Sequence, residues 1–279
     1  MRPDGSADFE ALTETVRIVG VRDGEGERAE SSLLDSVIRE GRLQVYADNV
    51  LLADAPALLD EPEAFACACL FLGSAVAAPG IGAVVPHIKA SRTSPGSIRV
   101  DVSLPAASAL AQPWEDIDAI DETSLRKAGL APLAPPSAGG ATLPIEAVFK
   151  AVAALSDEPS LYRRTGGVHS AGLARPDGSL VLRFEDISRR SAVDKTIGMA
   201  LIKGLISGSE ESAGFLVSSG RICSEFVVRA AKARFSLIAS VSAPTDRAVA
   251  LAESWGVTLC GFVRGKRMNI YTHEGRVLR

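Results

Sequence analysis

Residues 215–263 read FLVSSGRICSEFVVRAAKARFSLIASVSAPTDRAVALAESWGVTLCGFV and carry the clearest structural pattern in the chain. Short apolar runs alternate there with longer segments that suit helices, and turns rich in serine, glycine and proline separate them. Apolar strands that alternate with helices predict an α/β sheet that is covered on both faces. We therefore expect strands over residues 215–218, 237–241 and 258–263, and helices over residues 223–234 and 246–255.

The pattern extends to both sides of this stretch. Residues 143–157 have a proline near their start and place Ile145, Val148, Phe149 and Val152 on one helical face. The remaining elements expected in this half are a hairpin of residues 168–174 and 179–184 across the turn Arg175-Pro176-Asp177-Gly178, a helix over residues 192–206, and a last strand over residues 268–272.

The first half of the chain is less regular. Residues 1–40 are polar and indicate a loose N-terminal arm. Residues 41–112 predict a small α+β subdomain, with two strands around Ala47-Asp48-Asn49, a helix that opens at Asp60-Glu61-Pro62-Glu63, and a strand over residues 97–104. Residues 113–144 form a loop that ends in the linker APLAPPSAGG (131–140), and residues 145–279 form the α/β domain.

The composition excludes several classes of protein. The chain has 279 residues, of which 47% are hydrophobic and 23% charged, so it can bury a core and is not a disordered segment. A net charge of −4 and an aromatic content of 5% give no reason to expect nucleic acid as a partner.

Neither a membrane span nor a disulfide framework is expected. Residues 64–85 carry no charge, but they are rich in alanine and glycine and are broken at Pro79-Gly80, which favours a buried helix followed by a turn. No apolar segment follows the N-terminal arginine, so no secretory signal is visible. The four cysteines, Cys67, Cys69, Cys223 and Cys260, have no framework spacing, which indicates buried thiols in a reduced, cytoplasmic protein.

Two turns that follow predicted strands could bind an anion. Ser219-Gly220-Arg221 follows one strand, and Ser242-Ala243-Pro244-Thr245-Asp246 follows the next. Each turn opens a helix, where free backbone N–H groups and hydroxyls can hold a phosphate, and Arg221 could add a bidentate clamp. The alternative is that Ser219, and Thr245 or Ser242, only cap their helices.

Three other segments concentrate charge. Residues 163–169 (RRTGGVH) combine two arginines and paired glycines, which allow close backbone approach, with His169 on a predicted strand. The alternative is a solvated basic turn with a core histidine, which would by itself explain the two arginines. Residues 264–267 (RGKR) suit a phosphate. Residues 185–195 mix acids and bases at a helix entrance, where Asp194 and Lys195 could be a solvated pair. The three histidines lie far apart and pair with no other ligand, so no structural metal is expected.

Five runs of the second half together resemble the FdhD family of formate dehydrogenase accessory proteins. They occur in order across roughly half of the chain, whereas the residues before Pro113 resemble the family only faintly. The runs are YRRTGGVH (162–169), EDISRRSAVDK (185–195), SGRICSEFV (219–227), VSAPTDRAVALAE (241–253) and GFVRGKRMNIYTH (261–273).

This resemblance implies a fold, a function and a set of partners. FdhD proteins accept sulfur from a cysteine desulfurase, as a persulfide on a C-x-x-C loop. They pass it to the molybdenum of bis-molybdopterin guanine dinucleotide before that cofactor enters formate dehydrogenase. The implied fold is a cytidine-deaminase-like mixed sheet flanked by helices, with a smaller N-terminal α+β subdomain, in a homodimer. The implied cofactor-binding residues are Gly166, Gly167, His169, Arg189, Ser219, Gly220, Arg221, Ser242, Thr245, Phe262, Val263, Arg264, Gly265, Lys266 and Arg267.

The sequence departs from the family at the sulfur-carrying loop. The anchor Thr123-Ser124-Leu125 is present, but isoleucine stands at both cysteine positions, Ile117 and Ile120, and isoleucine cannot carry a persulfide. The family's Arg-His-Asn is Arg189-Arg190-Ser191 here. The binding half of the mechanism is therefore expected to be kept and the transfer half to be lost.

The expected function is that of an accessory protein which binds a molybdopterin guanine dinucleotide, or a related guanine nucleotide, as cargo for a formate dehydrogenase-type molybdoenzyme. One alternative is an active sulfurtransferase that uses a partner's thiol or Cys223, which lies in the first turn of a predicted helix beside Arg221. A second alternative is a scaffold or regulator that no longer binds the cofactor.

Overall fold

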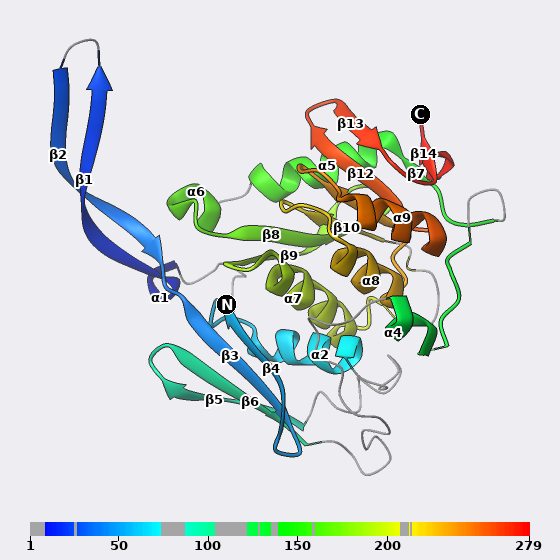
Figure 1. The fold of residues 1–279 in the computed structure, drawn as a ribbon, viewed down its shortest axis with the longest axis horizontal. Coiled ribbons are helices and arrows are strands. Elements are labelled where there is room, and N and C mark those ends of the chain that lie inside the picture. The colour runs from blue at the N-terminus through cyan, green and yellow to red at the C-terminus, as the bar shows by residue number, and fades with distance from the viewer. Residues whose placement is uncertain are drawn as a thin grey trace.

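A six-stranded mixed sheet forms the centre of the computed structural model, which describes residues 9–24, 27–73, 87–103, 122–127, 129–134, 139–157, 160–206, 212 and 214–279 (Figure 1). Its strand order is β13-β12-β11-β10-β8-β9. The three middle strands β10 (Phe215–Ser218), β11 (Leu237–Ser240) and β12 (Thr258–Arg264) are parallel. The antiparallel neighbours are β8 (His169–Ala174), β9 (Leu180–Asp186) and β13 (Arg267–Ile270).

Helices cover both faces of this sheet, as the alternation of strands and helices predicts. Side chains such as Leu216 and Ile238 face a core shared with α7 (Arg189–Ile202), α8 (Ser224–Lys232) and α9 (Asp246–Trp255). The alternate side chains, such as Val217 and Ala239, pack on α5 (Ile145–Asp157) on the other face. The mixed α/β fold expected from the sequence is therefore confirmed.

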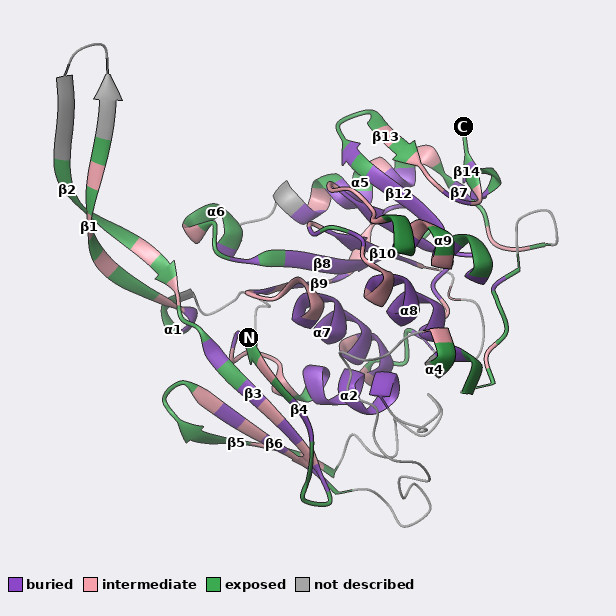
Figure 2. Ribbon diagram, in the orientation of Figure 1, coloured by how far each residue is buried: buried purple, intermediate pink, exposed green. Residues whose placement is uncertain are grey.

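A second, four-stranded sheet lies beside the first and has the order β4-β3-β6-β5. Helix α2 (Pro62–Gly73) packs between this sheet and α7, and it is buried from Ala64 to Gly73, as the purple of most of the helix in Figure 2 shows. Gly198 of α7 permits the close approach, because a Cβ there would collide with the backbone of Ala64. No helix in the described part of the chain is both long and apolar enough to cross a membrane. The strands are β3 (Gly41–Ala47), β4 (Val50–Ala57), β5 (Ile88–Ser94) and β6 (Ser97–Val102).

A buried ion cluster joins the two sheets. Lys195 of α7 has no exposed surface, and its ammonium group lies 2.7 Å from Asp186 and 3.0 Å from the carbonyl oxygen of Leu58, and also contacts Asp60. The charges of the two carboxylates outweigh the effect of burial and raise the pKa of Lys195. Asp186 also accepts from the backbone N–H groups of Leu58 and Ser188.

The proposed solvated pair of Asp194 and Lys195 is wrong. Both residues are buried, and each has another partner, since the carboxylate of Asp194 pairs with the guanidinium of Arg229 at 2.7 Å. Adjacent positions on a helix point in different directions, so Asp194 faces α8 while Lys195 faces the second sheet.

The expected loose arm is instead a long antiparallel hairpin. Strand β1 (Thr13–Gly24) pairs with β2 (Glu27–Ile38) along its whole length, after the short helix α1 (Phe9–Leu12). The polar composition of residues 1–40 concealed the alternation of valine and isoleucine with polar residues, which is the signal of a strand.

The described part of the expected linker is fastened to the α/β domain. The guanidinium of Arg276 is fully buried and donates to the carbonyl oxygens of Ala134, Ala141 and Gly256. The linker is followed by β7 (Leu143–Pro144), which pairs with β14 (Val277–Leu278), so α5 starts two residues later than expected. The described residues also form the helices α4 (Glu122–Lys127), α6 (Leu161–Thr165) and η4 (Glu274–Arg276).

Removing the buried cation should destabilise the protein strongly. In Lys195→Met, Asp186 stays buried without its counter-charge, so we expect the free energy of unfolding in urea to fall by about 3 to 5 kcal/mol. Lys203→Met, just past the exposed end of the same helix, is the matched control and should change it by less than about 0.5 kcal/mol. Equal stability of Lys195→Met and the parent would show that the cluster does not join the sheets.

Candidate functional site

The candidate site lies at the edge where the three parallel strands end. The turn Ser219-Gly220-Arg221 follows β10, residues 242–245 follow β11, and residues 264–267 turn from β12 into β13. Strand β8 runs antiparallel to β10, so its first residues, His169 and Ser170, lie at the same edge. The carboxyl ends of parallel strands are where open α/β sheets place ligands.

Backbone hydrogen bonds tie these turns together. Ser219 N–H donates to the carbonyl oxygen of Ser170, and Ile222 N–H donates to that of Ala243. Phe262 N–H donates to the carbonyl oxygen of Ser242. Segments that are far apart in the sequence therefore form one continuous rim.

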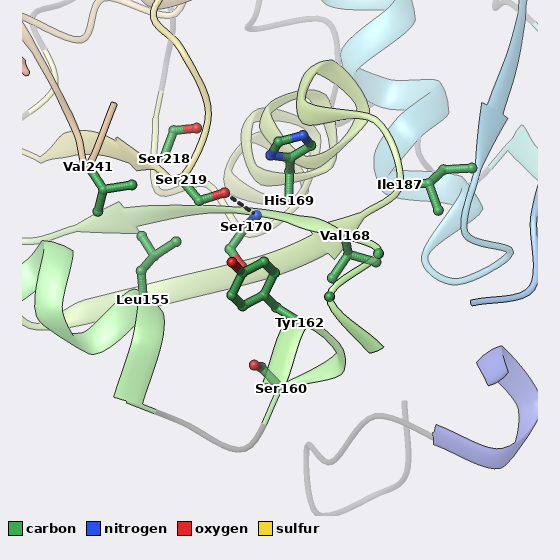
Figure 3. A pocket seen from close by; sticks show the side chains of 12 residues that line it. Leu155, Ser160, Tyr162, Val168, His169, Ser170, Ile187, Ser218, Ser219 and Val241 are labelled. Atoms are coloured by element: carbon green, nitrogen blue, oxygen red, sulfur yellow. Dashed lines mark hydrogen bonds between the residues drawn. The ribbon is translucent and has the colours of Figure 1, made fainter. Parts of the chain in front are cut away.

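A cavity of about 430 Å³ opens at this rim (Figure 3). Four residues predicted from the sequence line it, namely Gly166, Gly167, His169 and Ser219. Figure 3 shows the rings of His169 and Tyr162 on opposite sides of β8. The other lining residues carry no sequence signal that predicts them, and they are Leu155, Ser160, Tyr162, Val168, Ser170, Ile187, Ser218 and Val241.

Helix α6 forms one wall of the cavity, and its ends explain the RRTGGVH segment. The Ser160 hydroxyl accepts from Arg163 N–H, and the Glu185 carboxylate accepts from Leu161 N–H and Tyr162 N–H. Gly166 ends the helix with φ of 67°, a left-handed conformation that glycine adopts without strain. Glu185 could not be recognised as the partner of α6 from the sequence, because the pairing is made only in the folded sheet.

Two arginines, Arg189 and Arg221, act electrostatically on His169, and neither is among the residues that line the cavity. Arg189, at the start of α7, lies over Gly220, where a Cβ would come within 3.1 Å of the Arg189 side chain. Arg189 also faces Glu225 at 3.8 Å, and Arg221 is exposed. Burial, together with the positive charges of Arg189 and Arg221, lowers the pKa of His169. An anion beside His169 would lie in the positive field of both guanidinium groups.

The serine and threonine side chains of the turns have structural roles. The Thr245 hydroxyl accepts from Ala248 N–H and caps α9, as the capping alternative predicts. The Ser219 hydroxyl instead accepts from Ser170 N–H and ties β10 to β8. Ser242 N–H donates to the Ser240 hydroxyl.

The basic turn Arg264-Gly265-Lys266-Arg267 is exposed and lies outside the residues that line the cavity. Phe262, just before it, has φ of 52° and is 39% exposed, beside an irregularity in the pairing of β12 with β13. A positive φ at an aromatic residue is strained and is often found at functional sites. Val263 is buried in the core, so only its backbone could face a ligand there.

Cys223 differs from the other three cysteines, which are buried. It is half-buried at the N-cap of α8, where its side chain makes no capping hydrogen bond. Burial raises the pKa of both Cys67 and Cys260 to about 12. Ile117 and Ile120 lie outside the described residues.

A second cavity, of about 520 Å³, lies between α4, α8 and α9. Thr123 and Ser224 are among the residues that line it. Ser224 directly follows Cys223, and Thr123 comes shortly after Ile120 in the sequence. Among the described residues, no group of three or more histidine, cysteine or acidic side chains is arranged to hold a metal ion.

Comparison with known proteins identifies relatives of this chain. A sulfur carrier protein FdhD of Anaeromyxobacter dehalogenans (strain 2CP-C) is 41% identical over 145 residues, which are 51% of this chain and 50% of that protein. The FdhD of Saccharolobus solfataricus is 39% identical over 132 residues, 47% of this chain and 50% of that protein. The chain thus spans about half the length of the curated relatives it matches.

A solved structure and a family model extend the comparison. A structure described as a formate dehydrogenase accessory protein from Desulfotalea psychrophila has the same fold, with a TM-score of 0.70, 24% identity, and coverage of 96% of this chain and all of that one. The model of the FdhD/NarQ family matches residues 119–278. Because this match covers more than half of the chain, the protein belongs to the FdhD/NarQ family.

Proposed function

We propose that this chain is an accessory protein that binds a molybdopterin guanine dinucleotide during the maturation of a formate dehydrogenase-type molybdoenzyme. The observation that carries the proposal is the convergence of the RRTGGVH, SGR and SAPT segments on one sheet edge, beside the 430 Å³ cavity. Family membership supports the same assignment.

The residues at this edge suit a guanylated cargo. The cavity offers hydroxyl groups and apolar walls to a flat heterocycle, and the glycines of the rim leave room for backbone contacts. Arg189 and Arg221 would meet the diphosphate through charge-assisted hydrogen bonds, and the exposed 264–267 turn would add cations. We also propose that the strands and helices of the main sheet are arranged as in cytidine deaminases.

We propose that the usual persulfide relay is absent. Isoleucine occupies both expected cysteine positions, and a pKa of about 12 keeps Cys67 and Cys260 protonated at neutral pH. A protonated buried thiol is a poor nucleophile toward a sulfur donor. The protein would then hold the cofactor while sulfur is supplied elsewhere.

A second candidate function is sulfur transfer through Cys223 or a partner's thiol. This candidate is favoured by the second cavity, because its lining includes Ser224, which follows Cys223, and Thr123, which comes shortly after Ile120. A scaffold that does not bind the cofactor is the third alternative. The proposed partners are the molybdoenzyme, a cysteine desulfurase and a second copy of this chain, in the cytoplasm.

Guanosine diphosphate should bind at the rim. Isothermal titration should give a saturable signal, and GDP should raise the melting temperature because it binds the native state. Arg221→Ala should weaken binding by about 10-fold or more, since one charge-assisted hydrogen bond is lost. Arg175→Ala, which changes an exposed arginine in the turn between β8 and β9, should bind as the parent does. A flat titration of the parent would favour the scaffold alternative.

The affinity for GDP should depend on His169 and on pH. Burial and the charges of Arg189 and Arg221 lower the pKa of His169, so the imidazole is neutral near pH 7 and gains its charge only under acidic conditions. A bound diphosphate favours the charged form, so the ratio of parent to His169→Gln affinity should rise toward acid pH, by up to about 10-fold. The protonation of GDP affects its binding to both proteins equally, so it cancels in this ratio. A ratio that stays constant between pH 5 and 8 would place the phosphates away from His169.

The cysteines should differ in their reactivity. In the native protein at pH 8, iodoacetamide should alkylate Cys223 first, because a pKa of about 12 leaves roughly one thiol in ten thousand ionised at Cys67 and Cys260. After unfolding, all four should react, as shown by intact mass and peptide mapping. Native alkylation of Cys67 ahead of Cys223 would contradict the burial described for α2.

A further inference from the structure

The second cavity lies in the layer of helices that covers one face of the main sheet. Figure 1 shows α8 and α9 side by side in this layer, with α4 next to them. The cavity between the three helices has a volume of about 520 Å³, which is within the range of pockets that bind small organic molecules. Among the described residues, none lines both this cavity and the one at the rim. The proposed binding of a guanine nucleotide therefore leaves this cavity without a ligand.

The two longer helices each turn one face toward the cavity. The lining residues of α9 follow the first of them at three, four and seven positions, and those of α8 are four positions apart, which is the spacing of one helical face. These residues are Arg247, Ala250, Leu251 and Ser254 on α9, and Ser224 and Val228 on α8.

The cavity has a polar end and an apolar end. Helices α8 and α9 connect neighbouring parallel strands on the same face of the sheet, so both start at the carboxyl edge and run in the same direction. Ser224 and Arg247 are in the first turns of these helices, whereas Val228 and Leu251 come one turn later. Polar groups thus lie at the end near the carboxyl edge, and apolar groups lie at the other end.

The polar end offers a cation and a hydroxyl group that are not engaged elsewhere. Within the described part of the chain, the guanidinium of Arg247 and the hydroxyl of Ser224 make no hydrogen bond or ion pair. The carboxylate of Glu122, which also lines the cavity, is paired with Arg126 one turn later on α4. Arg126 in turn lies over the ring of Trp255. The charge that remains for a ligand to compensate is therefore the single positive charge of Arg247.

This arrangement selects a carboxylate among the common anions. A guanidinium group matches the two oxygens of a carboxylate in bidentate geometry, and the single negative charge compensates that of Arg247. A doubly charged phosphate would keep one charge uncompensated in a cavity that also contains the carboxylate of Glu122. The apolar end requires that the carboxylate be attached to an apolar group.

We propose that the second cavity binds a carboxylate carried on a small apolar body, which is either a free organic acid or the C-terminal residue of an apolar peptide. The carboxylate accepts hydrogen bonds from the guanidinium of Arg247 and from the hydroxyl of Ser224. The apolar body packs between Val228 and Leu251. This inference uses only the helical layer, so it holds whether or not the rim binds GDP.

Amide-resolved NMR of the full chain during titration with N-acetyl-leucine and with octanoate tests the proposal. At least one acid should cause saturable shifts at Ser224, Val228 and Leu251. The neutral amide of N-acetyl-leucine has the same shape, and it should bind about 10-fold or more weakly than the acid because the charge-assisted hydrogen bonds are lost. Tighter binding of octanoate identifies a free acid as the source, and tighter binding of N-acetyl-leucine identifies a chain end. No saturable shift with either acid would overturn the proposal.

Two exposed positions on α9 provide the variants. Arg247→Gln should weaken binding of the acid by about 10-fold or more and leave binding of the neutral amide unchanged. Arg175→Gln, which changes an exposed arginine in the turn between β8 and β9, is the matched control and should bind as the parent does. Equal affinity of the acid for Arg247→Gln and the parent would contradict the assigned role of the guanidinium.

A competing carboxylate on the protein gives an independent test. Ala250→Glu places a carboxylate three residues after Arg247 on the same helical face, where it can pair with the guanidinium and exclude the ligand. This variant should weaken binding of the acid by about 10-fold or more, whereas Ala250→Gln, which has the same size but no charge, should retain most of it. Arg221→Ala should weaken binding of GDP and leave binding of the acid unchanged, so failure at the rim and failure at this cavity can be told apart. An unchanged affinity of Ala250→Glu for the acid would overturn the proposal.

Discussion

The ammonium group of Lys195 is the point on which this structure depends. It is buried between Asp186 at the end of β9 and Asp60 ahead of α2, and so it links the two sheets through one cation. Asp186 also accepts from Ser188 N–H, which fixes the turn that leads into α7. That turn sets the start of α7 and brings Arg189 over Gly220. A structural ion cluster thereby positions a cation at the proposed binding edge.

The topology of the main sheet explains why the site needs residues from distant parts of the sequence. An antiparallel strand, β8, is inserted beside the parallel strand β10, so the start of one meets the end of the other. His169 and Ser219 become neighbours in this way, and Glu185 on β9 reaches the first turn of α6. The edge then combines glycine turns, hydroxyl groups and guanidinium groups. This combination suits a diphosphate.

The sequence alone predicts the elements with strong apolar runs. Strand β10 and helix α9 have the bounds expected from the pattern, and the cavity contains four of the predicted residues. Long-range partners could not be predicted in this way. The sequence pattern favours a solvated Lys195, because its partners, Asp60 and Asp186, are brought to it only by the fold. The β1–β2 hairpin is hard to predict because its polar residues outweigh its alternating valines. The short helix α6 has local caps in Ser160 and Gly166, but its contact with Glu185 is made only in the folded sheet.

The central claim is that the carboxyl edge of the main sheet holds a guanylated diphosphate through backbone amides and guanidinium groups. Amide-resolved NMR of the protein during titration with GDP tests it most directly. The account predicts saturable shifts of the amides of Gly166, Gly167, Ser219 and Gly220, with the amides of the four-stranded sheet unchanged. Saturable shifts confined to the second cavity around Thr123 and Ser224, or no shifts at all, would contradict it.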